Sequence, residues 1–124
     1  MSEPLLVVDG ANVVGSVPDG WWRDRAGAAV RLRDRLVPIT SAGLADLPGP
    51  VEVVLVVEGK ARDILEIAEV RVERAAGSGD DAIVDVVASA PQGQRVVVVT
   101  ADRGLRDRVT ALGAEVRGPG SLPR

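Results

Sequence analysis

Leu5-Leu6-Val7-Val8-Asp9-Gly10 is a continuous apolar run that stops at an acid and a glycine, which predicts a buried β-strand ending in a turn. The same pattern recurs near the other end of the chain, where the valine run 96–99 is followed by Thr100-Ala101-Asp102. Uninterrupted valine-rich runs are typical of strands buried on both faces of a parallel sheet. The two runs therefore predict a parallel sheet whose strands end in aspartates.

Helical segments separate most of the predicted strands. Apolar residues recur at helical spacing from Arg23 to Val37, and Pro38 is expected to stop or bend that helix. The alternation predicts a three-layer α/β/α, Rossmann-like domain with a mostly parallel sheet of four or five strands. We expect this domain to span residues 1–118, with a flexible C-terminal tail over 119–124. The remaining expected elements are a loop at 11–22, strands at 51–57, 70–72 and 114–116, and helices opening at Asp80 and near Leu105.

Residue content limits the chemistry that the chain can perform. Its 124 residues suffice for one domain, and its net charge of −3 argues weakly against nucleic-acid binding. Cysteine and histidine are absent, so any catalytic metal must be held by oxygen atoms, which favours Mg²⁺ or Mn²⁺. No apolar stretch is long enough to cross a membrane, and the N-terminus lacks the features of a signal peptide. We therefore expect a cytoplasmic protein without a membrane partner.

Several aspartates are expected to gather at one edge of the sheet. Asp9 and Asp102 follow strands, and ligands bind at the carboxyl ends of strands in open parallel sheets. Asp80 and Asp81 open the helix that precedes the fourth strand. Carboxylates placed together repel one another, and a bound divalent cation would relieve that repulsion. Singly, each of these residues is explained by a turn or a helix cap; jointly, they favour a metal site.

Three segments resemble the acidic motifs of NYN domains in the PIN-like nuclease superfamily, and are most similar to the bacterial YacP-like group. They are Val8-Asp9-Gly10-Ala11-Asn12-Val13-Val14, Gly79-Asp80-Asp81-Ala82-Ile83-Val84 and Val98-Val99-Thr100-Ala101-Asp102-Arg103-Gly104-Leu105. The resemblance extends from Leu5 to about Leu122, and the motifs occur in the family's order. It implies a PIN-like fold for the whole domain.

The resemblance also implies an activity, a cofactor and a set of site residues. It implies a ribonuclease that uses Mg²⁺ or Mn²⁺ to hydrolyse single-stranded or structured RNA. Its catalytic, metal-binding acids would be Asp9, Asp80, Asp81 and Asp102, and Asn12 and Thr100 match polar positions expected to contact the substrate. YacP-like sequences often carry a further acid where this chain has Val84; the nearest acid is Asp85, which is either a fourth acid of the site or a solvated side chain.

Basic and aromatic residues supply the expected RNA contacts. Arg103 and Lys60 follow strand ends and are the best candidates for binding phosphate, whereas Arg31 to Arg35 are interpreted as a solvated helix face. Trp21 and Trp22 are the only aromatic residues. One of them could stack on a base, but packing of at least one against the following helix is favoured.

The sequence alone leaves three other functions open. The missing acid at Val84 and the negative net charge fit a catalytically weak or inactive RNA-binding or scaffold protein. A toxin-type PIN nuclease with an antitoxin fits the Asp9-Gly10-Ala11-Asn12 motif less well. A nucleotide-binding module is disfavoured, because the chain has no glycine-rich phosphate loop. RNA is the expected partner, with a homodimer or an RNA-processing protein as further candidates.

Overall fold

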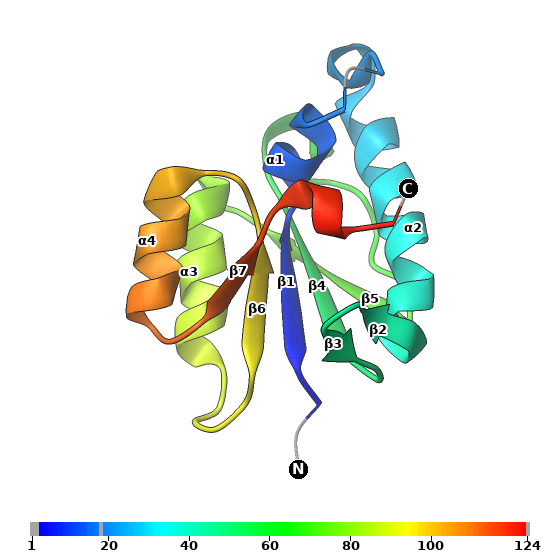
Figure 1. Cartoon of the computed structure of the whole chain (residues 1–124). Helices are drawn as coiled ribbons and strands as arrows, with labels where there is room; N and C mark the ends of the chain where they lie inside the picture. Colours follow the sequence, from blue (N-terminus) through cyan, green and yellow to red (C-terminus); the bar gives the residue numbers. More distant parts are fainter. Residues whose placement is uncertain (1–2, 18, 124) are drawn as a thin grey trace.

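A five-stranded, fully parallel sheet forms the centre of the computed structural model, which describes residues 3–17 and 19–123. The strand order is β5-β4-β1-β6-β7 (Figure 1). The registers are parallel throughout, with Leu5 of β1 opposite Glu52 of β4 and Val96 of β6. The sheet and its class are therefore as the sequence predicts. The strands are β1 (Leu5–Asp9), β4 (Glu52–Val57), β5 (Val70–Arg74), β6 (Val96–Val99) and β7 (Glu115–Arg117).

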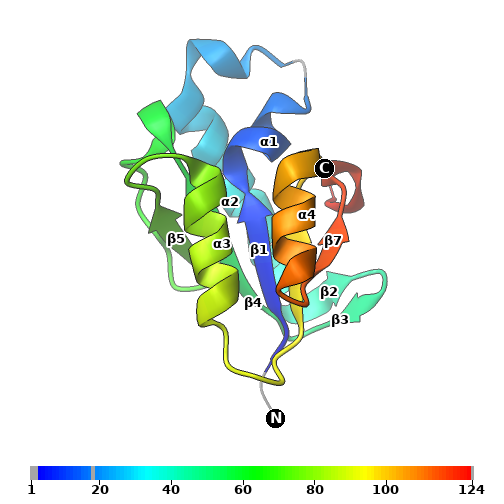
Figure 2. The same cartoon turned by 90° about the vertical axis from the view of Figure 1, so that its left-hand side faces the viewer.

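Helices cover both faces of the sheet and make it the middle of three layers. α2 (Arg25–Ala42) lies on one face, and α3 (Gly79–Ser89) and α4 (Arg103–Ala111) lie side by side on the other (Figure 2). Successive side chains of each strand point to opposite faces of the sheet. Leu6 and Val8 pack on the α2 side, whereas Leu5 and Val7 pack on the α3 and α4 side. The valine runs are uninterrupted because both faces are buried.

Smaller elements complete the chain. α1 (Gly10–Gly15) follows β1 directly, and a two-stranded antiparallel hairpin of β2 (Gly43–Leu44) and β3 (Leu47–Pro48) follows α2. Three short 3₁₀ helices are η1 (Trp21–Arg23), η2 (Gly59–Ala61) and η3 (Pro119–Ser121). Within the described residues, no helix is both long and apolar enough to cross a membrane.

The strand order reverses at β1. The chain passes from β1 to β4 and β5 on one side, and then returns to β6 on the other side of β1. Such a reversal leaves a crevice at the carboxyl ends of the two central strands, where ligands bind in open α/β sheets. Because β1 pairs directly with β6, the segments after Asp9 and after Val99 emerge next to each other at this crevice.

Two predicted boundaries on the α2 side are wrong. Residues 10–15 form a helix and not a loop, because Asp9 caps it and Val13 is buried in the core. α2 also continues through Pro38 to Ala42. The proline removes the hydrogen bond to the carbonyl of Asp34, but both residues lie on the exposed side of α2, where water can satisfy that carbonyl.

Two further differences concern α3 and the C-terminus. α3 begins at Gly79, and its cap is Ser78, whose hydroxyl accepts a hydrogen bond from the backbone N–H of Asp81 at 3.2 Å. The expected tail over 119–124 is not loose where it is described, because η3 places Leu122 in the core on the α2 side. Arg124 lies outside the described residues, and the domain boundary at 118 stays a prediction.

Gly10 gives a direct test of how tightly β1 and β4 meet at this edge. A Cβ at Gly10 would lie 2.6 Å from the backbone oxygen of Val56, so Gly10→Ala must displace backbone. We expect a loss of about 1–3 kcal/mol of unfolding free energy, measured by urea denaturation. Gly104→Ala is the matched control, because its Cβ would make only an ordinary 3.5 Å contact, and it should be neutral or slightly stabilising. Equal stability of the two variants would contradict the close approach.

Candidate active site

Asp9 is the most deeply placed acid at the carboxyl edge. It is the last residue of β1, only 5% of its surface is exposed, and it caps α1. Its Oδ2 accepts a hydrogen bond from the hydroxyl of Thr100 at 2.8 Å, and its Oδ1 accepts one from the backbone N–H of Asn12 at 3.4 Å. Asp9 is therefore held in one orientation by Asn12 of α1 and by Thr100 after β6.

Thr100 and Asn12 join the end of β1 and the start of α1 to the loop after β6. The hydroxyl of Thr100 accepts a hydrogen bond from the backbone N–H of Asp102 at 3.1 Å, and Oδ1 of Asn12 accepts one from the N–H of Ala101 at 2.8 Å. Thr100 is completely buried, so the predicted substrate contact by Thr100 does not fit the structure. Its role is to orient Asp9 and Asp102. Asn12 is half-buried, and its side-chain amide nitrogen donates no hydrogen bond to the described residues.

Asp102 and Asp80 approach the same place from the two helices on one face of the sheet. Asp102 caps α4 by accepting a hydrogen bond from the backbone N–H of Leu105 at 2.9 Å. Asp102 is exposed to solvent. Asp80 lies in the first turn of α3 and is half-buried. Burial, and then the charges of Asp102 and Glu58, raise the pKa of Asp80. Acids from two other elements are thus close enough to Asp80 for their charges to change its pKa.

Glu58 is a fourth acid of the cluster, and it was missed among the site residues predicted from the sequence. It directly follows β4, and its Oε2 accepts a hydrogen bond from the backbone N–H of Gly79 at 2.6 Å, at the start of α3. Its charge raises the pKa values of both Asp9 and Asp80. The signal was present in the sequence, because Glu58 ends a buried strand as Asp9 does. We call Asp9, Glu58, Asp80 and Asp102 the acid cluster.

The acid cluster holds unfavourable electrostatic energy. Burial raises the pKa of Asp9, and the hydrogen bonds from Thr100 and Asn12 oppose that shift only in part. The charges of Asp80 and Glu58 raise the pKa of Asp9 further. A cation placed among these carboxylates would stabilise their charged forms.

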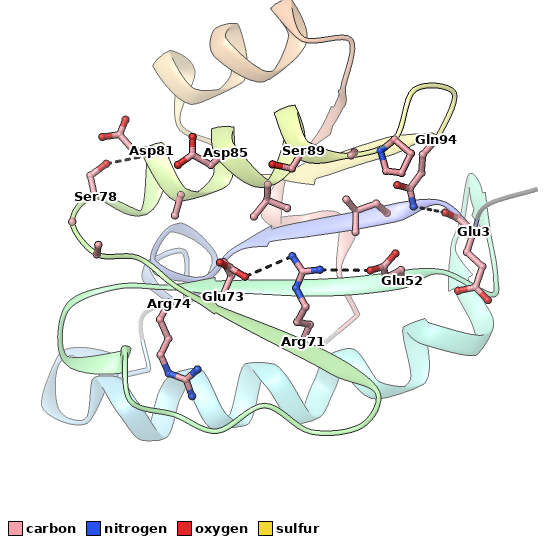
Figure 3. A pocket seen from close by; sticks show the side chains of 17 residues that line it. Glu3, Glu52, Arg71, Glu73, Arg74, Ser78, Asp81, Asp85, Ser89 and Gln94 are labelled. Carbon is pink, nitrogen blue, oxygen red and sulfur yellow. Dashed lines mark hydrogen bonds and ion pairs between the residues drawn. The ribbon is translucent and has the colours of Figure 1, made fainter.

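Asp81 and Asp85 do not belong to this cluster. The side chain of Asp81 is 71% exposed and pairs with Arg108 at 3.0 Å. Both aspartates line a groove of about 960 Å³ between α3 and β5 (Figure 3). This groove also contains Glu52 and Glu73, whose charges face Arg71 at 3.8 and 3.6 Å. The structure thus places Asp81 and Asp85 in the groove beside β5, although the charge of Asp81 also raises the pKa of Asp80. Their role as metal-site acids stays a prediction.

Two of the predicted RNA-binding residues lie near the acid cluster. Arg103 is exposed at the first position of α4, next to Asp102, and forms no ion pair with another described residue. Lys60 is exposed in η2, two residues after Glu58. The start of α2 adds Arg25, whose guanidinium lies 5.5 Å from the ring centroid of Trp21.

The acid cluster fits a hard divalent cation that keeps much of its water. Its donors are all carboxylate oxygens, which Mg²⁺ and Mn²⁺ prefer. Within the part of the chain that the structure describes, however, no three acidic side chains are close enough to hold one ion. Mg²⁺ commonly binds through one or two carboxylates together with water and substrate phosphate, so such a site does not require three converging acids.

Comparison with known structures identifies the fold. The crystal structure of Rae1 (YacP) from Bacillus subtilis matches 98% of this chain and 71% of its own chain, with a TM-score of 0.76 and 18% sequence identity. The chain shares the fold of YacP. A mutant of YacP in another crystal structure matches 96% of this chain and 72% of its own, with a TM-score of 0.72 and 18% identity. No family model and no curated protein matches the sequence.

Asp80→Asn should raise the melting temperature of the metal-free protein at neutral pH. The pKa of Asp80 is raised above its ordinary value of 3.8, so the folded state binds the proton more tightly than the unfolded state does. The folded state therefore loses stability as the pH rises from 3.8 through the raised pKa, and the asparagine variant avoids that loss.

Thermal melts between pH 3 and pH 8, roughly the range over which carboxylates titrate, measure the effect. The advantage of Asp80→Asn should disappear below the ordinary pKa, where Asp80 is protonated in both states. Asp85→Asn is the control, because Asp85 is exposed on the same helix and lies outside the acid cluster. A variant at Asp80 that melts below the parent at neutral pH would show that the carboxylate is stabilising.

Proposed function

We propose that this chain is a metal-dependent ribonuclease of the YacP-like NYN family, which hydrolyses RNA phosphodiester bonds with Mg²⁺ or Mn²⁺. One observation carries the proposal: four acids, at the ends of β1 and β4 and at the starts of α3 and α4, lie at the edge where the strand order reverses, and their charges raise the pKa values of Asp9 and Asp80. Nothing in the described fold neutralises Asp9, whose pKa is raised by burial and by neighbouring acids. The YacP fold and the three YacP-like motifs support the same conclusion.

Each residue of the cluster has a defined task in this proposal. Asp9, held by Thr100, would be the fixed ligand, and Asp80 would be the second. Glu58 anchors the start of α3 and so determines how far Asp80 lies from Asp9. Asp102 is exposed and would complete the site through water or when RNA is bound.

The metal would polarise the scissile phosphate and lower the pKa of a water molecule, which supplies a nucleophile at neutral pH. The chain has no histidine, so no imidazole is available as a general base. The described acids therefore have to orient that water and accept its proton. Arg103 would hold a non-bridging phosphate oxygen, because its guanidinium is always charged and has no acidic partner among the described residues.

A catalytically inactive RNA-binding protein is the alternative that the geometry favours next. The inactive alternative is supported by the geometry of the acids, because no three of them among the described residues are close enough to hold one ion. The two functions differ in one measurable property, which is whether metal-dependent cleavage occurs at all.

Cleavage of a labelled RNA pool with Mn²⁺ tests the proposal. We expect cleavage by the parent protein, a loss of about 100-fold or more in Asp9→Asn, and a similarly large loss in Asp80→Asn. Asp85→Asn should cleave like the parent, since Asp85 lies in the groove beside β5. RNA binding without cleavage by the parent would instead establish the scaffold function. Equal losses at Asp80 and Asp85 would contradict the assignment of the site.

Arg103→Ala should weaken RNA binding while leaving metal binding intact. Removing one phosphate contact should lower the slope of log affinity against log salt by about 0.7 for single-stranded RNA. The control is Arg31→Ala, which removes the same charge from an exposed position on α2, on the other face of the sheet. Filter binding at several salt concentrations measures both slopes. The same slope and affinity in Arg103→Ala and the parent would place the RNA elsewhere.

A further inference from the structure

A second, more apolar cavity adjoins the acid cluster on the α2 side. Its volume is about 370 Å³, within the range of small-molecule sites, and it lies between α1, η1, the start of α2 and the end of β4. The walls that matter here are formed by Val14, Trp21, Arg25, Ala29, Val57 and Glu58. The proposed hydrolysis uses none of these side chains except Glu58.

The cavity combines one aromatic ring with one cation. Trp21 is half-buried, and its ring meets that of Trp22 edge to face with 6.0 Å between centroids. Arg25 lies 5.5 Å from the centroid of Trp21 and lines the same cavity. Trp22 is 55% exposed and is not part of the cavity lining. The two neighbouring tryptophans therefore occupy different environments.

Glu58 connects this cavity to the acid cluster. It lines the cavity, and its charge acts on both Asp9 and Asp80. Gly10, which follows Asp9 directly, also lines the cavity. A ligand in the cavity would thus lie directly beside a phosphate held at the acid cluster.

We propose that this cavity holds one unpaired nucleobase of the RNA, next to the phosphate that is cleaved. This proposal rests on the proposed ribonuclease function and adds the element that positions its substrate. A planar base suits a cavity with an aromatic wall, because every base has a face that can stack on an indole ring. The Arg25 guanidinium, which already lies over one face of the Trp21 ring, suits the phosphate attached to a base stacked on the other face. An apolar peptide side chain would form no favourable interaction with the charge of Arg25, so it is a less suitable occupant.

The two tryptophans allow the proposal to be tested by fluorescence, without metal and without cleavage. Trp22→Phe leaves Trp21 as the only indole, and Trp21→Phe leaves Trp22. Each variant is titrated with AMP in the presence of EDTA, and ribose 5-phosphate serves as the probe that lacks a base. We expect saturable quenching by AMP in Trp22→Phe only, and little response to ribose 5-phosphate. Equal quenching of both tryptophans, or equal responses to both probes, would overturn the proposal.

Cleavage kinetics provide the second arm. Trp21→Leu should raise the KM for a short single-stranded RNA about tenfold, because stacking on one base is lost, whereas Trp22→Leu should stay near the parent value. Equal KM values for Trp21→Leu and the parent would overturn the base pocket even if the parent cleaves RNA well. AMP quenching in a parent that never cleaves RNA would refute the nuclease and retain the pocket. The failures of the two proposals are therefore distinguishable.

Discussion

The parallel pairing of β1 between β4 and β6 is the constraint on which the rest of the structure depends. Because all three strands run in the same direction, their carboxyl ends lie at one edge, and every residue that follows them meets there. Asp9, Glu58 and Thr100 are the first residues to emerge at that edge, and the hydrogen bond between Thr100 and Asp9 closes the junction between β1 and β6. α3 and α4 then begin at the same edge and bring in Asp80 and Asp102. The acid cluster is thus a consequence of strand direction.

Stability and charge oppose each other at this junction. The valine-rich strands bury almost all of their side chains and provide the hydrophobic energy of the fold. That same burial removes water from Asp9 and Asp80 and raises their pKa values. Hydrogen bonds from Thr100 and from the backbone of Asn12 hold Asp9 in place but do not cancel the cost. A bound cation would relieve this cost at the carboxyl edge. The groove beside β5 differs because Arg71 pairs there with Glu52 and Glu73.

The sequence predicted the sheet and much of the acid cluster, and it failed where tertiary contacts decide. Long valine runs and strand-end aspartates are strong local signals, so β1, β6, Asp9 and Asp102 could be placed from pattern alone. The pattern could not choose between Asp80 and Asp81, because only the packing of α3 on the sheet determines which of them faces the cluster. Glu58 was overlooked because a glutamate before glycine also suits an ordinary turn. α1 was read as a loop, since its six residues carry too little periodicity to identify a helix.

We propose that Asp9 and Asp80 together hold a divalent cation at the edge where the strand order reverses. The most direct test is a crystal structure of the protein soaked in Mn²⁺, with the ion located by its anomalous scattering. We expect a peak within about 2.3 Å of carboxylate oxygens of Asp9 and Asp80, with water completing the coordination. It would be contradicted by an ion bound only in the groove at Asp81 and Asp85, or by an acid cluster that stays free of the ion at saturating Mn²⁺.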